Sequence, residues 1–197
     1  MTDATSSAKA AVRRELRAAR RAAVATRDRD ADAVAIAAAV LAGCVDTVAD
    51  GATVAIYRSL PTEPPTDALA AELHARGLPV LVPVLLPDKD LDWCRLLADG
   101  STGPALGPDA IARAAVVVTP ALAVDVSGAR LGQGGGSYDR ALRRRAPGAL
   151  VVAVVGDDEL LPGPLPAVGH DVRVDAVVTP GRGMLRLPIA APVAGGR

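Results

Sequence analysis

Four glycines within five positions are the residues of this sequence best suited to hold a ligand. Residues 132–136 read Gly-Gln-Gly-Gly-Gly, between Arg130 and a helix-like segment that starts Ser137-Tyr138-Asp139-Arg140. Glycine allows positive φ and leaves the backbone bare, so successive N–H groups can turn toward one anion. A phosphate is the expected guest, with arginines on both flanks and a helix N-terminus behind it. The alternative is a glycine-rich connector that binds nothing.

Known phosphate motifs do not describe this loop. A Walker P-loop needs a lysine after its second glycine, and no lysine lies near the segment. A dinucleotide fingerprint would need its third glycine at position 137, which is Ser137, and would normally occupy the first strand–helix turn.

Two aspartates could add a metal ion to the phosphate. Asp139 follows the glycines directly, and Asp171 precedes the last expected strand. Magnesium typically takes one or two protein carboxylates together with phosphate oxygens and water, so the pair could share one ion if the fold brings them together. The histidines His74 and His170 have no partners at zinc-ligand spacing.

The first helix is expected to carry a cationic ridge beside an apolar stripe. The ridge consists of Lys9, Arg13, Arg17 and Arg20, and the stripe consists of Val12, Leu16, Ala19 and Ala23. We expect the stripe to be buried. The ridge either serves a function or is an ordinary solvated face.

A second loop with chemical potential follows an expected strand at residues 52–57. Residues 58–66 start with Arg58 and hold Glu63 among three prolines. A carboxylate in a stiff loop can orient a substrate amide or amine, whereas the alternative is a carboxylate that merely solvates the loop.

The bulk composition indicates one globular domain. The chain has 197 residues, half of them hydrophobic, and a formal net charge of zero, which gives no sign of a nucleic-acid or membrane surface. Cys44 and Cys94 lack CxxC spacing and the start is not signal-like, so we expect a cytoplasmic location. The longest uncharged stretch, residues 33–45, is shorter than the roughly 20 residues of a membrane span.

Strands and helices are expected to alternate. Expected strands cover residues 52–57, 78–86, 91–97, 114–119, 150–155 and 172–179. Expected helices include two before residue 51, one at 66–77 with Thr66 as N-cap, a short one at 109–113 and one at 138–145. The near-continuous apolar runs of the expected strands predict a parallel sheet that is covered on both faces by helices. In such a sheet, ligands bind beyond the carboxyl ends of the strands. We expect a single domain over residues 1–187 and a disordered tail over 188–197.

These residues together resemble the 5-formyltetrahydrofolate cyclo-ligase family, also called methenyltetrahydrofolate synthetases. The resemblance follows nearly the whole chain in order, through residues 9–13, 57–66, 120–125, 128, 130–140, 165–166, 170–171 and 174–179. The block Arg-Leu-Gly-x-Gly-Gly-Gly-x-Tyr-Asp-Arg is its most specific part.

The resemblance implies a three-layer α/β/α fold with a mainly parallel sheet. It also implies magnesium- and ATP-dependent cyclisation of 5-formyltetrahydrofolate to 5,10-methenyltetrahydrofolate, with release of ADP and phosphate after phosphorylation of the formyl oxygen. The partners would be the reduced folate and ATP, with no nucleic acid, membrane or protein partner. No covalent nucleophile on the protein is required.

The resemblance also implies roles for individual residues. The ATP-binding residues would be Lys9, Arg13, Arg130, Leu131, Gly132, Gln133, Gly134, Gly135, Gly136, Ser137 and Tyr138. The substrate-binding residues would be Arg58, Glu63, Gly134, Gly135 and Tyr138, although Tyr138 could equally support the loop. Magnesium would be bound by Asp139 and Asp171.

The chain departs from common family patterns at Val124, Gln133, Ser137 and Pro180. Two other functions stay open on the residues alone. One is a different enzyme on a related sheet, of the sugar-phosphate isomerase or CoA-transferase type, which would need no ATP. The other is a nucleic-acid-binding module that uses the basic helix, although aromatic residues make up only 2% of the chain.

Overall fold

The computed structural model describes residues 2–166 and 171–189, with side chains from residue 7 onward. Its main sheet has the strand order β11-β10-β8-β5-β1-β2-β3-β4. The strands are β1 (Thr53–Ala55), β2 (Val80–Leu85), β3 (Leu91–Leu96), β4 (Thr102–Ala105), β5 (Ala114–Pro120), β8 (Leu150–Val154), β10 (Ala176–Thr179) and β11 (Gly183–Arg186). A small second sheet has the order β7-β6-β9, from β6 (Ala123–Asp125), β7 (Arg130–Leu131) and β9 (Leu160–Leu161).

The centre of the main sheet is parallel and its edges are antiparallel. Strands β10, β8, β5, β1 and β2 run in one direction, while β11 pairs antiparallel with β10 and β3 pairs antiparallel with β2. The mainly parallel sheet predicted from the apolar runs is therefore confirmed. The sequence prediction missed β4, β11 and the small sheet, and the last parallel strand is shorter than expected because it begins at Ala176.

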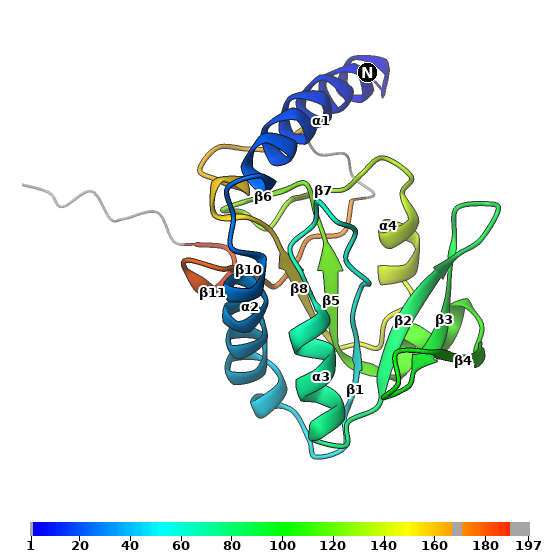
Figure 1. Ribbon diagram of the computed structural model, residues 1–197. Coiled ribbons are helices and arrows are strands. Elements are labelled where there is room, and N and C mark those ends of the chain that lie inside the picture. Colours follow the sequence, from blue (N-terminus) through cyan, green and yellow to red (C-terminus); the bar gives the residue numbers. More distant parts are fainter. Residues whose placement is uncertain (1, 167–170, 190–197) are drawn as a thin grey trace, which may run out of the picture.

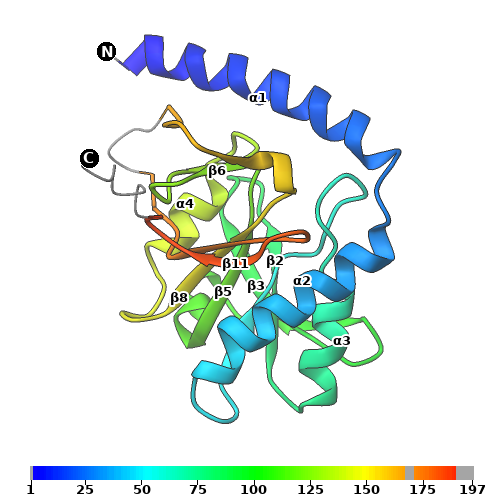
Figure 2. The ribbon, with the colours of Figure 1, turned by 90° about the vertical axis from the view of Figure 1, so that its left-hand side faces the viewer.

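Helices cover both faces of the sheet. Helices α2 (Arg29–Gly43) and α3 (Asp67–Ala75) pack on one face, over a core that includes Ile36, Leu69 and Val116. Helix α4 (Ser137–Leu142) and the 3-10 helix Pro108–Arg113 pack on the other face, over Trp93 and Val117. Figures 1 and 2 show these layers, and the predicted three-layer arrangement is confirmed.

Helix α1 (Thr2–Val24) stands apart from these layers. It lies across one end of the molecule, next to the small sheet (Figures 1 and 2). Its Val12 and Leu16 pack against a satellite cluster that includes Ala123, Leu131 and Leu165. The expected burial of the stripe is only partly met, because Val12, Leu16 and Ala23 are half-buried and Ala19 is exposed.

Other features qualify the expectations from the sequence. In α2 the buried residues are Ile36, Ala37, Val40 and Leu41, whereas Val34 lies outside that buried face and is 65% exposed. No helix within the described ranges is long and apolar enough to cross a membrane.

Most of the expected tail, residues 190–197, lies outside the described residues. Within the described part, the N–H of Ile189 donates a hydrogen bond to Val126 O over 2.9 Å.

Candidate functional site

The carboxyl ends of the parallel strands converge on the end of the molecule that α1 covers. In Figure 1 the arrowhead of β5 points toward α1, β6 and β7. The glycine loop leaves β7 at this end, and the loops after β1, β5 and β8 also start here. This is the position at which open α/β sheets bind their ligands, as expected from the strand pattern.

The glycine loop offers bare and unused backbone donors. Gly134 and Gly136 have φ values of +116° and +70°, which other residues rarely adopt. Residues 133–135 are exposed, and their N–H groups donate to no hydrogen bond within the part of the chain that the structure describes. Helix α4 is only six residues long, so the positive potential at the loop must come mainly from charged side chains.

The cationic ridge of α1 supplies that positive potential, because it faces the protein and not the solvent. The Nε atom of Arg13 donates to Gly132 O over 3.0 Å, and the Nε atom of Arg17 donates to Gln133 Oε1 over 3.1 Å. Arg17 Nη2 also donates to Gln133 O. Burial and the charge of Arg17 lower the pKa of Arg13, while Asp171 and Asp139 oppose that shift. The solvated-face alternative for this ridge is therefore wrong.

Each of the two candidate metal ligands is paired with a cation. The carboxylate of Asp171 lies 2.6 Å from Lys9 Nζ, and that of Asp139 lies 2.7 Å from Arg130 Nη2. The charges of both carboxylates also favour the protonated form of Arg13, so both act on the same guanidinium. Groups of three or more His, Cys, Asp or Glu side chains able to hold a metal are absent from the described residues. Two carboxylates suit magnesium that arrives with a nucleotide, whose phosphates supply further ligands.

Arg130 and Tyr138 border the glycine loop on its two sides and contact each other. The guanidinium carbon of Arg130 lies 5.9 Å from the centroid of the Tyr138 ring, which is a cation–π contact. The Nε of Arg130 and the hydroxyl of Tyr138 are buried without a hydrogen-bond partner in the described part of the chain. Burial raises the pKa of Tyr138, although Arg130 opposes this, so the phenol stays protonated and can donate.

The loop after β1 buries Glu63. Glu63 is only 5% exposed, and its Oε2 accepts a hydrogen bond from Leu60 N over 3.0 Å. Arg29 Nη1 donates to the carbonyls of Pro61 and Glu63 over 2.8 and 2.9 Å and so closes the loop from outside. The alternative of a merely solvated carboxylate is therefore wrong.

Tyr57 links the Glu63 loop to the rest of the site. Its hydroxyl donates to Pro64 O over 2.7 Å, and its carbonyl accepts from Thr66 Oγ1 over 2.8 Å. Thr66 thus occupies the predicted N-cap position of α3 but does not cap the helix with its hydroxyl. Burial is the main cause of the raised pKa of both Tyr57 and Tyr138, and the charge of Glu63 adds to it in both. The charge of Glu63 therefore acts on Tyr138 beside the glycine loop as well as on Tyr57 in its own loop.

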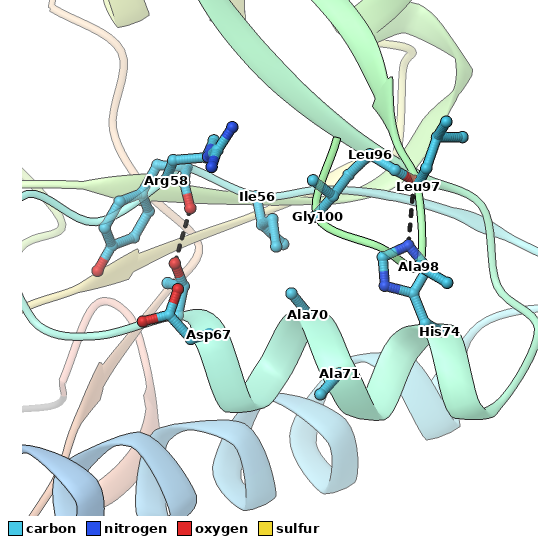
Figure 3. A pocket seen from close by; sticks show the side chains of 12 residues that line it. Ile56, Arg58, Asp67, Ala70, Ala71, His74, Leu96, Leu97, Ala98 and Gly100 are labelled. Atoms are coloured by element: carbon cyan, nitrogen blue, oxygen red, sulfur yellow. Dashed lines mark hydrogen bonds between the residues drawn. The ribbon is translucent and has the colours of Figure 1, made fainter. Parts of the chain in front are cut away.

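Arg58 borders a groove beside this site. The groove has a volume of about 230 Å³ and runs between α3 and the end of β3, with Arg58 and Asp67 near one end and His74 near the other (Figure 3). His74 Nε2 donates a hydrogen bond to Leu96 O over 3.0 Å. The imidazole is therefore held as part of the wall of the groove. Unlike Arg13, Arg58 forms no hydrogen bond or ion pair with a glycine-loop residue among the described residues.

Two contributors to the site were missed in the sequence. Arg29 was unassigned, and Glu159, which is 8% exposed, pairs with Arg20 of the cationic ridge. A signal for Glu159 existed, because the acidic run at residues 157–159 directly follows a buried strand at its carboxyl end. Nothing in the local sequence around Arg29 marks its long-range contact.

Comparisons with known proteins show which family this chain resembles. The model of the 5-formyltetrahydrofolate cyclo-ligase family matches residues 5–180. A 5-formyltetrahydrofolate cyclo-ligase from Mycolicibacterium smegmatis is 42% identical over 152 residues, which cover 70% of this chain and 78% of that protein. The Escherichia coli protein of the same name is 31% identical, over 66% of this chain and 79% of its own length.

Solved structures show the same fold. A 5,10-methenyltetrahydrofolate synthetase from Mycoplasma pneumoniae has a TM-score of 0.68 at 19% identity, covering 86% of this chain and 96% of that one. The Aquifex aeolicus synthetase has a TM-score of 0.66 at 21% identity, with 95% and 96% covered. With the family model matching most of its length, this chain belongs to the 5-formyltetrahydrofolate cyclo-ligase family.

Proposed function

We propose that this protein uses ATP and magnesium to cyclise 5-formyltetrahydrofolate to 5,10-methenyltetrahydrofolate, releasing ADP and phosphate. The observation that carries the assignment is the set of exposed, unused N–H groups at residues 133–135, lying under the cationic face of α1. Such a cradle suits a triphosphate, because backbone donors and cations neutralise phosphate charge without needing a protein nucleophile. Family membership favours the same reaction.

The nucleotide phosphates are proposed to lie between α1 and the glycine loop. Lys9 and Arg13 bind them from the helix, and residues 130–138 wrap them from below. Asp139 and Asp171 would hold the magnesium ion, which neutralises phosphate charge and helps to align the γ-phosphoryl group. The support is that Asp171 pairs with Lys9 of α1, that Asp139 pairs with Arg130 beside the glycine loop, and that the charges of both act on Arg13.

The reduced folate is proposed to lie against the Glu63 loop. The buried carboxylate of Glu63 orients the folate, and Arg58 contacts it from the loop's start. The protonated phenol of Tyr138 is a hydrogen-bond donor at the border between the two substrates. Gly134 and Gly135 leave room for the folate to approach the nucleotide, since they have no side chains.

The chemistry needs positioning more than it needs acid–base groups. The formyl oxygen attacks the γ-phosphorus, the bond to ADP breaks, and an imidate-like phosphate forms. The neighbouring folate nitrogen then attacks the formyl carbon and loses its proton, and inorganic phosphate leaves with the former formyl oxygen. The protein holds the two reactants in line and excludes water around the loop.

The test is a spectrophotometric ring-closure assay on the purified protein. 5-Formyltetrahydrofolate with magnesium and ATP should produce the near-ultraviolet absorbance of the methenyl product, with ADP formed in equal amount. A non-hydrolysable ATP analogue is the matched control and should give no product. Product formation without ATP, or none with it, would contradict the proposal.

A further inference from the structure

We propose that Arg20 and Glu159 are positioning residues that hold α1 in register with the glycine loop and thereby set the affinity for the nucleotide. This inference rests on the proposed nucleotide role of α1. Neither residue touches the glycine loop, so the pair acts through the other cations of the same helix face.

The two side chains form a bidentate and buried ion pair. Arg20 Nε lies 2.6 Å from Glu159 Oε1, and Arg20 Nη2 lies 2.6 Å from Glu159 Oε2. Their side chains are 4% and 10% exposed. Two parallel charge-assisted hydrogen bonds fix both the distance and the direction of the guanidinium, which a single bond to a lysine would not do.

The pair connects α1 to two strand ends. Arg20 Nη2 also donates to Ala121 O over 2.5 Å, just beyond β5. Glu159 Oε2 accepts from Gly156 N over 2.6 Å, just beyond β8. Because β5 and β8 are adjacent parallel strands at the centre of the sheet, the pair anchors the helix to the most rigid part of the fold.

Elsewhere along α1, Lys9, Arg13 and Arg17 bond to Asp171 and to the glycine loop, and not to the layered core. From residue 7 onward, its packed apolar side chains are chiefly Val12 and Leu16, which are only half-buried. Lys9 and Arg20 are separated by eleven residues, about three helical turns or roughly 16 Å along the axis, so they share one face. A small rotation or tilt at Arg20 would therefore displace Arg13 from the glycine loop and Lys9 from Asp171.

Gly156 shows how tightly the backbone packs against this pair. A Cβ added to Gly156 would lie 2.7 Å from Arg27 Nη1 and 3.2 Å from Glu159 Oε2. Its φ of −69° is open to any residue, so alanine there would disturb the neighbouring side chains without straining the backbone. Gly156→Ala thus crowds Arg27 and, to a smaller extent, Glu159, while it keeps both charges of the pair.

The kinetic experiment compares Arg20→Met with Arg21→Met, an exposed neighbour on the same helix. We expect Arg20→Met to raise the KM for magnesium-ATP by about tenfold or more, as small misplacements of binding groups do, with the KM for 5-formyltetrahydrofolate changed far less. Gly156→Ala should act in the same direction, and Arg21→Met should resemble the wild type. A parallel rise in both KM values, or an ATP KM that stays normal, overturns the inference.

A double-mutant cycle with Lys9→Ala tests whether the pair acts through the helix cations. If it does, the effect of Arg20→Met on the KM for ATP should largely disappear in the Lys9→Ala background, because the positioned group is gone. Full additivity overturns the inference. If Lys9→Ala alone leaves the ATP dependence unchanged, the proposed nucleotide site fails instead.

Hydrogen exchange gives a readout that does not depend on the nucleotide. In Arg20→Met the amides of α1 should exchange faster, while those of β5 and β8 stay protected as in the wild type. Unchanged hydrogen exchange in α1 would show that the Arg20–Glu159 pair does not hold the helix in place. If Arg20→Met does not fold, Gly156→Ala carries both the kinetic and the exchange measurement.

Discussion

Individual charges at the site are balanced before any ligand binds. Lys9 compensates the charge of Asp171, and Arg130 compensates the charge of Asp139. The charges of both carboxylates also act on Arg13. The site is therefore prepared for a nucleotide that brings both negative phosphates and a counter-ion, and less for a metal ion alone.

Replacement of Asp139 by asparagine tests its proposed metal role. The amide keeps an acceptor oxygen for Arg130, whose bond to Asp139 is 2.7 Å, but it removes the negative charge. We expect kcat to fall by about 100-fold or more, since metal-held phosphate charge is a leading part of phosphoryl transfer. The free energy of unfolding should fall by only about 1 kcal/mol. Steady-state kinetics over a range of magnesium concentrations and a urea titration measure both.

Asp90→Asn is the matched control for that variant. Asp90 also forms a 2.7 Å pair with an arginine, Arg144, but it lies in the β2–β3 hairpin outside the site. Its substitution should leave kcat and the magnesium dependence unchanged. Normal turnover by Asp139→Asn would remove Asp139 from the metal site.

At the scale of elements, the start of α2 holds the Glu63 loop in place. Arg29 donates to two carbonyls of that loop, those of Pro61 and Glu63, and so fixes the backbone that carries the carboxylate. We expect Arg29→Met to raise the KM for 5-formyltetrahydrofolate by about tenfold, with little change in the KM for ATP. Arg76→Met, which breaks an exposed pair with Asp46, is the control and should change neither value. A selective rise in the KM for ATP would contradict this role.

The turn between β6 and β7 depends on one buried carboxylate. Asp125 is 1% exposed and accepts from Ser127, Ala129 and Leu165. Burial alone would raise the pKa of Asp125, but these hydrogen bonds outweigh it and hold the pKa below its ordinary value. The carboxylate therefore stabilises the turn that leads into the glycine loop.

The lowered pKa of Asp125 makes its stabilising effect depend on pH. A carboxyl group with a depressed folded-state pKa stabilises the fold above the unfolded pKa, about 4, and loses that effect as pH falls through the folded value. We expect Asp125→Asn to lower the free energy of unfolding by about 2 kcal/mol at pH 7. The gap to wild type should narrow below about pH 4 in urea titrations. Asp158→Asn, an exposed neighbour of Glu159, should show no such gap; a gap for Asp125→Asn that is constant from pH 7 to pH 3 would refute the explanation.

Local patterns predicted the central elements of the fold and failed at its edges. Strands β5 and β8 are continuous apolar runs, and such runs indicate buried parallel strands. Strand β4 contains Gly103 and Pro104, which are typical of a turn, so only its pairing with β3 makes it a strand. The buried face of α2 is not evident from its sequence, because alanine at many positions gives the helix no dominant apolar stripe.

At the scale of the whole molecule, the glycine loop could be predicted and its partners could not. The loop is visible because glycine spacing is local. The bonds that complete the site join residues far apart in sequence: Lys9 and Asp171 are separated by 162 positions, Arg20 and Glu159 by 139. Either cation on α1 could equally have faced solvent, since a helical period shows which residues share a face but not what that face contacts.

The separation between α1 and the layered core predicts a local response to the nucleotide. Magnesium-ATP should slow hydrogen exchange in α1 and in residues 132–136, because it joins the helix cations to the loop N–H groups. Ligand at 100 times its Kd stabilises the bound form by about 2.7 kcal/mol, which corresponds to roughly 100-fold slower opening of those amides. Amides of α3 should change much less, since α3 packs on the core through Leu69 and Leu73. Lys9→Ala should lose most of the protection in α1 and keep some in the loop. Protection that spreads evenly over α1 and α3, or that leaves α1 unchanged in the wild type, would show that the nucleotide does not bind between the helix and the loop.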